Sequence, residues 1–90
     1  MPTIHLPTRM RNYTEGKSTV TVSGENISNM LENLVKGYPG IDEHLYDESH
    51  NIKSYTKVFL NDTDIDKLDG IDTKVENRDT VYLVTAMAGG

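Results

Sequence analysis

The chain has 90 residues, of which 36% are hydrophobic, so we expect one small domain with a modest core rather than a self-contained enzyme with a deep cleft. Nine basic residues, scattered along the chain, against fourteen acidic ones give a formal charge of -5, so nucleic acid is not an expected partner. The sequence has no cysteine, which excludes a disulfide frame and a thiolate metal site.

The first part of the chain is expected to form a hairpin with a long loop. Ile4 and Leu6 alternate with polar neighbours, and Val20 and Val22 do the same within residues 18–23, a pattern typical of half-buried strands. Residues 7–17 are polar and end in a glycine turn signal. We therefore predict two paired strands joined by a polar loop.

From Asn26 onward the apolar residues take a helical spacing. They are Ile27, Met30, Leu31, Leu34 and Tyr38. This spacing predicts one amphipathic helix over residues 27–37 with Asn26 as its N-cap. We expect residues 37–40 to stop the helix, because glycine suits a left-handed cap and proline cannot continue the hydrogen-bond ladder. Ile41 and Leu45 are expected to close the edge of the core.

After a polar loop, residues 56–60 return to a period of two. This period places Val58 and Leu60 on one face of a strand and Phe59 on the other. Residues 61–64 read as a turn, with Ile65 as a short returning strand, and an irregular connection is expected to follow.

The last strand is predicted over residues 80–84. The predicted order of elements is strand, strand, helix, strand, short strand and strand. This order predicts an α+β fold, with a mixed sheet of about five strands packed on one main helix. We expect a domain over residues 1–85 and a flexible tail over residues 86–90.

This order of elements, closing on two glycines, resembles the β-grasp fold of ubiquitin and of the MoaD/ThiS family of sulfur carriers. Five segments are similar to the carriers of the phosphoserine-dependent cysteine pathway: IHLPTRMR (4–11), YPGI (38–41), LYDE (45–48), VFLNDTDI (58–65) and AMAGG (86–90). Two places depart from that branch. Residues 76–79 stand where a glycine-containing acidic turn is common, and Thr85 where a proline is usual.

Two terminal glycines suit a chemical role for the C-terminal carboxylate. A carboxylate that is to be joined to AMP must enter a nucleotide pocket, and Gly89 and Gly90 make a thin probe because they lack Cβ atoms. The resemblance implies that an E1-like adenylyltransferase, using ATP and magnesium, activates the Gly90 carboxylate. It further implies that sulfur then replaces AMP as a thiocarboxylate, and that a biosynthetic enzyme accepts the sulfur. The chain is then a substrate and carrier, not an enzyme, and binds no cofactor itself.

A carrier also needs a surface that its partners can hold. If Val81 and Leu83 face the helix, then Tyr82 and Val84 face solvent, with Phe59 beside them on the neighbouring strand. Exposed apolar clusters on small proteins usually serve binding. The alternative is that the two faces are reversed. We further expect a partner groove to grip Met87, Ala88 and Gly89, although Met87 could instead pack loosely on the body of the domain.

Several alternatives stay open at this point. Cysteine synthesis is the narrowest interpretation of the pathway, with molybdopterin and thiamine thiazole synthesis as the others. The same adenylate could conjugate Gly90 to lysines of other proteins, as a ubiquitin-like modifier does. The chain could also be a non-catalytic β-grasp interaction domain. We expect a cytoplasmic location, since no basic leader or membrane-length apolar run is visible.

No metal site is expected. His5, His44 and His50 lack a common metal-ligand spacing. The acidic residues between 62 and 72 lack the central glycine and the terminal glutamate of a calcium loop at the required offsets.

Overall fold

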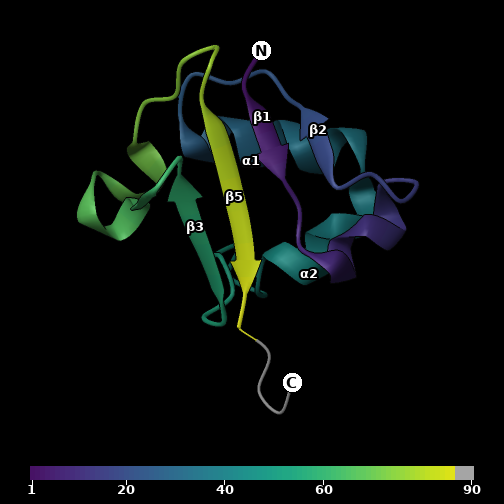
Figure 1. Cartoon of the computed structure of the whole chain (residues 1–90). Helices are drawn as coiled ribbons and strands as arrows, with labels where there is room; N and C mark the ends of the chain where they lie inside the picture. Colours follow the sequence, from purple (N-terminus) through teal and green to yellow (C-terminus); the bar gives the residue numbers. More distant parts are fainter. Residues whose placement is uncertain (87–90) are drawn as a thin grey trace.

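Five strands form one mixed sheet in the order β2-β1-β5-β3-β4 (Figure 1). The structure is a computed structural model and describes residues 1–86. The strands are β1 (Thr3–His5), β2 (Thr19–Thr21), β3 (Thr56–Leu60), β4 (Thr63–Asp64) and β5 (Thr80–Thr85). Strand β1 pairs antiparallel with β2 and parallel with β5, which pairs antiparallel with β3. The predicted hairpin of the first two strands is confirmed.

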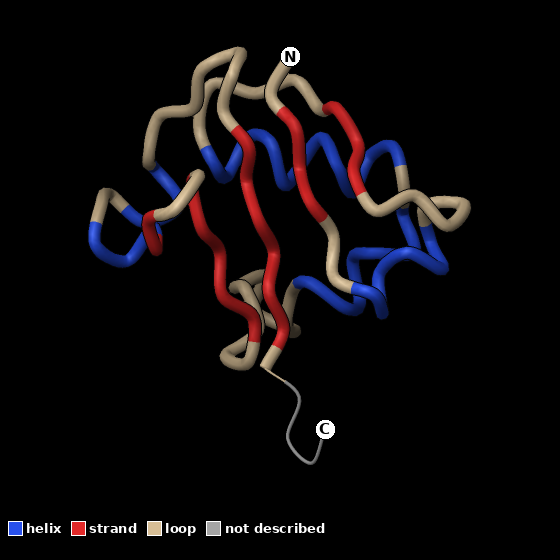
Figure 2. Tube along the Cα trace, viewed as in Figure 1, coloured by secondary structure: helices blue, strands red, loops and turns tan. Residues whose placement is uncertain are grey.

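The main helix, α1 (Ile27–Gly37), crosses one face of the sheet (Figure 2). Its N-cap is Asn26, whose side chain accepts a hydrogen bond from the Asn29 N–H at 2.8 Å. The predicted bounds and N-cap of this helix are therefore confirmed, as is the α+β class. The predicted glycine cap is wrong, because Gly37 does not adopt a positive φ. Instead, the Tyr38 N–H donates to the Leu34 carbonyl, and Pro39 then begins a 3-10 turn.

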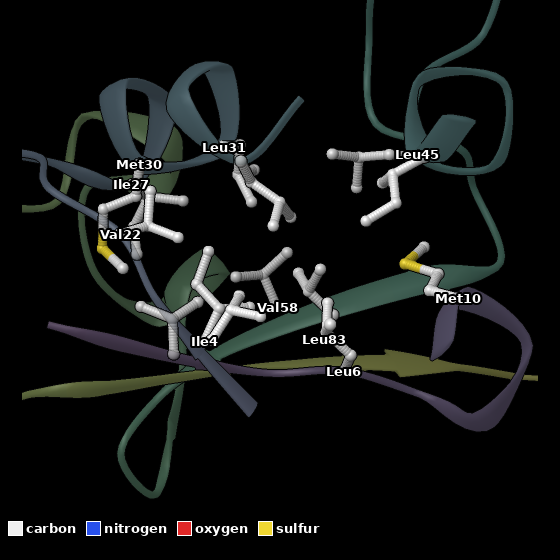
Figure 3. Packing of buried hydrophobic residues seen from close by; sticks show 14 of the residues in the cluster. Ile4, Leu6, Met10, Val22, Ile27, Met30, Leu31, Leu45, Val58 and Leu83 are labelled. Carbon is white, nitrogen blue, oxygen red and sulfur yellow. The ribbon is translucent and has the colours of Figure 1, made fainter. Parts of the chain in front are cut away.

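The core lies between α1 and the inner face of the sheet. Figure 3 shows Ile27, Met30 and Leu31 of the helix meeting side chains from three strands: Ile4, Val58 and Leu83. Ile41 and Leu45 are fully buried, so the expectation that they close the core edge is confirmed. Leu45 ends a short helix, α2 (Asp42–Leu45), which follows the 3-10 turn η2 (Pro39–Ile41).

Residues 7–17 are not the plain polar loop that the sequence predicts. They contain a 3-10 helix, η1 (Thr8–Tyr13), which buries Met10 at the Leu45 end of the core (Figure 3). A single methionine anchors this segment, and one apolar residue in a polar stretch leaves no periodic signal. The glycine turn signal is confirmed, since Gly16 has a φ of 81°.

The predicted strand at Ile65 is also misplaced. The returning strand β4 lies at Thr63–Asp64, and Ile65 begins a 3-10 turn, η3 (Ile65–Lys67). The Asp64 side chain accepts a hydrogen bond from the Asp66 N–H at 2.9 Å and so caps this turn. A second turn, η4 (Gly70–Asp72), completes the connection. Within residues 1–86, no helix combines the length and apolar character needed to cross a bilayer.

Candidate functional site

Strand β5 carries two of the predicted partner-binding residues. Its side chains alternate, with Val81 and Leu83 0% and 2% exposed and Tyr82 and Val84 37% and 46% exposed. The predicted assignment of faces is confirmed, and the reversed arrangement is excluded. Strand β5 lies between β1 and β3 (Figure 1), so the exposed pair is on the central strand of the sheet.

Phe59 joins this pair from the neighbouring strand. It is directly opposite Tyr82 in the antiparallel register of β3 and β5, and its side chain is half-buried. Side chains opposite each other in such a ladder project from the same face at contact distance. The structure thus brings Phe59, Tyr82 and Val84 together, while Val84 is the most exposed of the apolar residues on β5.

A residue on β1 extends the surface, and the sequence interpretation did not include it. His5 is opposite Tyr82 in the parallel register, and the two ring centroids are 5.4 Å apart. Its position between the buried Ile4 and Leu6 could have placed it on the outer face, because a period of two turns alternate residues outward. We call His5, Tyr82, Phe59 and Val84 the outer patch.

Charged side chains border the outer patch at β3 and η3. Lys57 is opposite Val84 in register, and its Nζ lies 3.5 Å from an Asp66 oxygen and 4.0 Å from an Asp64 oxygen. Lysine and aspartate are both exposed in the closer pair, so the ion pair adds little to stability. The outer patch therefore has an apolar and aromatic centre with a polar rim, a composition that docking surfaces usually have.

Strand β5 ends beside the outer patch. After β5, the Ala86 N–H donates to the Tyr55 carbonyl at 2.8 Å, which carries the β3–β5 ladder one residue beyond the strand. The predicted tail residues Met87, Ala88, Gly89 and Gly90 lie outside the described residues. A segment of four residues can span at most about 14 Å. A partner that acts on Gly90 must therefore approach close to this corner of the sheet.

The three histidines take part in separate local contacts. His44 Nε2 lies 2.8 Å from the Tyr13 hydroxyl, and the His50 ring stacks on Tyr46 with a centroid distance of 4.0 Å. No group of three His, Asp or Glu side chains that could hold a metal occurs in the part of the chain that the structure describes.

The sequence matches the family model described as the ThiS family over residues 4–90. It is 31% identical over 90 residues to the sulfur carrier protein CysO of Mycobacterium tuberculosis, in an alignment that covers 98% of this chain and 97% of the relative. The CysO sequence of Mycobacterium bovis gives the same values.

Solved structures agree with this similarity. A crystal structure of an Amycolatopsis orientalis BexX/CysO complex matches with a TM-score of 0.90 and 27% identity, covering 100% of both chains. CysO of Mycobacterium tuberculosis matches with a TM-score of 0.88 and 28% identity, covering 97% of this chain and 100% of that one. The small archaeal modifier protein 1 of Methanosarcina acetivorans, 21% identical with a TM-score of 0.84 over 99% of this chain and 95% of that one, shares the fold. The β-grasp fold is confirmed.

Proposed function

Because the chain belongs to the ThiS family, we propose that it carries sulfur on the carboxylate of Gly90. The observation that supports this most directly is the position of the outer patch. Tyr82 and Val84 are exposed on β5, and Ala86, which still bonds to Tyr55, lies four residues before Gly90 in the sequence. A partner enzyme can therefore hold the patch and receive the end of the chain at the same time.

The proposed reaction proceeds in two steps. An E1-like adenylyltransferase joins the Gly90 carboxylate to AMP, with magnesium on the phosphates of ATP and pyrophosphate as the leaving group. Hydrosulfide-level sulfur then attacks the acyl carbon and displaces AMP, which leaves a thiocarboxylate. The partner enzyme makes and breaks these bonds, so the chain acts as a substrate and binds no cofactor of its own. Because Gly89 and Gly90 lack side chains, the end of the chain is thin enough to enter the nucleotide pocket of the partner enzyme.

A second partner accepts the sulfur. We assign this role to a biosynthetic enzyme, and cysteine synthesis is the pathway that the similarity to CysO favours over molybdopterin or thiamine thiazole synthesis. The occurrence of a related CysO in a BexX/CysO complex supports docking to a partner protein as part of the function. The cytoplasm is the proposed location, because ATP and sulfur donors for biosynthesis are available there.

Adding one alanine after Gly90 tests this function. The added residue displaces the reacting carboxylate, so we expect ATP-dependent pyrophosphate release by an E1-like enzyme of the same host to fall to background. One alanine added before Met1 is the matched control and should leave the rate unchanged. Equal rates for the two extended proteins would contradict the proposal and favour a plain interaction domain. Gly-Gly remnants on lysines of other proteins would instead indicate a modifier.

A further inference from the structure

A groove opens on the inner side of the sheet at the edge of β3, and its lining residues Lys57, Asp64 and Asp66 also border the outer patch. Its volume is about 360 Å³, and it lies between α1, the loop before β3, and the turns η3 and η4. Its apolar wall is formed by Leu31, Val58, Ile65 and Ile71, and its polar wall includes Tyr46 and Thr56. We call it the β3 groove. A volume of this size accommodates a large side chain.

Thr56 gives the β3 groove an unusual feature. The residue is only 7% exposed, and its Oγ1 has no hydrogen-bond partner among the described residues. Buried hydroxyl groups are normally paired, because losing water without gaining a partner is costly. Valine would fill the same space without this cost. A hydroxyl at this position is therefore suited to a polar atom that arrives with a ligand.

The backbone of β3 beside the groove is also unpaired on one side. Strand β4 pairs only with Phe59 and Leu60, so residues 56–58 have a neighbouring strand only at β5, as Figure 1 shows. The Ala86 N–H bonds to Tyr55 and the Asn61 N–H bonds to Thr80, which means that odd-numbered residues of β3 point their backbone groups at β5. Even-numbered residues point theirs outward.

Two of these outward groups have no partner among residues 1–86. The Thr56 N–H donates to the Lys53 carbonyl at 2.9 Å, but the Thr56 carbonyl and the Val58 N–H are unused. One acceptor and one donor, two residues apart along a strand, can bond to both backbone groups of a single residue in an added parallel strand. The backbone N–H and C=O of an extended peptide have the spacing of the Thr56 carbonyl and the Val58 N–H. This spacing therefore favours a peptide over a small molecule.

We propose that the β3 groove binds an extended segment of a partner protein, which adds to the sheet at residues 56–58. It inserts one large side chain beside Thr56 that is apolar along its length and carries a polar atom bonding to the Thr56 hydroxyl. Three carboxylates, of Glu32, Asp64 and Asp66, and two lysines line the groove, and the whole chain carries a charge of -5. A segment with basic residues next to its apolar anchor is therefore preferred over an acidic one.

The site is separate from the apolar residues proposed for sulfur transfer, because Thr56 and Val58 lie on the opposite face of the sheet from Tyr82 and Val84. Its position still matters for partners. Thr56 is opposite Thr85 in register, so a bound segment would lie near the C-terminal end of β5. A protein held in the β3 groove would thus bind close to the C-terminal end of β5 and touch the charged border of the outer patch, but it would leave Tyr82 and Val84 uncovered.

A display library of random peptides, selected on the full-length protein, tests this proposal. Selected peptides should share one large residue with an apolar body and a polar tip, such as tyrosine or tryptophan, flanked by lysine or arginine. Titrated into isotope-labelled protein, they should shift the resonances of Thr56, Val58, Ile65 and Ile71. Hydrogen exchange at the Val58 amide should slow in the complex, because that N–H gains a partner, whereas the Lys57 and Phe59 amides are already paired to β5.

Two matched variants complete the test. Thr56→Val should weaken peptide binding about five-fold, since it removes one hydrogen bond to the ligand. Thr19→Val, the same change on the β2 edge of the sheet, should leave the affinity unchanged. A library with no peptide that shifts the groove resonances would overturn the proposal. Binding that leaves Val58 exchange unchanged, or shifts at the groove that grow with protein concentration alone, would also overturn it and favour a small ligand or a second copy.

Discussion

Val84 and Leu68 are apolar side chains of nearly equal exposure, at 46% and 45%, in different parts of the surface. At the residue scale, Val84→Asp should lower kcat/KM for adenylation by about ten-fold, because it places a charge in the outer patch. The free energy of unfolding should fall by about 1 kcal/mol or less. Leu68→Asp is the control. Equal kinetics of the two variants with the E1-like enzyme would argue against the patch as a docking site.

Thr56 and Thr73 are both 7% exposed but differ in their hydrogen bonds. The Thr73 hydroxyl accepts from the Asp69 N–H at 3.0 Å, whereas the Thr56 hydroxyl has no partner in the described part of the chain. Thr56→Val should therefore raise the free energy of unfolding by about 1 kcal/mol, and Thr73→Val should lower it by about 1–3 kcal/mol. Urea unfolding measures both. Destabilisation by Thr56→Val would show that its hydroxyl is already satisfied.

Tyr46 gives the stability a defined dependence on pH. Burial, followed by the carboxylates of Glu32 and Asp42, raises the pKa of the Tyr46 phenol from 10.0 to about 12. Between these values the folded state binds more protons than the unfolded chain, so the contribution of this group is complete below pH 10.0 and is lost as the pH rises toward 12. The difference in free energy of unfolding between the wild type and Tyr46→Phe should shift in favour of the variant over this range. A constant difference in urea titrations would contradict it.

At the scale of the element, α1 depends on its first turn. Asn26 accepts from the Asn29 N–H at 2.8 Å, and the Asn29 side chain accepts from the Glu25 N–H at 3.1 Å. Asn26→Ala should lower the free energy of unfolding by about 1 kcal/mol, while Asn26→Asp should retain the cap. Adenylation of the folded protein should be unaffected, because α1 covers the face opposite the outer patch. Equal stability of the two variants would contradict this role.

The elements that the sequence predicts best are those with a repeated burial pattern. Residues 27–37 bury one helical face, and β3 and β5 bury every second side chain, so each leaves a signal over several residues. The 3-10 segments η1 and η3 were missed because each is fixed by one buried residue and local hydrogen bonds. The end of α1 was placed correctly, but the expected glycine cap was wrong, because the backbone of Tyr38 closes the last turn without a left-handed glycine.

For the whole molecule, the residues on the outer face of the sheet could be predicted from the sequence, whereas the groove on the inner side could not. Tyr82, Val84 and Phe59 could be assigned from a period of two. The same period could have assigned His5, which the sequence interpretation left out. The β3 groove could not be predicted, because its walls come from α1, the loop before β3 and the η turns, which only the tertiary fold brings together. The division into a domain over residues 1–85 and a tail over residues 86–90 stays a prediction.

The most direct test of sulfur transfer is accurate-mass fragmentation of the intact protein, purified from its own host without reductant or acid. We predict that a fraction of the molecules carries one sulfur in place of one oxygen, localised to Gly90. Fragmentation is essential because oxidation of any of the four methionines adds nearly the same mass. A Gly90 that stays an ordinary carboxylate, and that forms no adenylate with any E1-like enzyme of that host, would contradict the account.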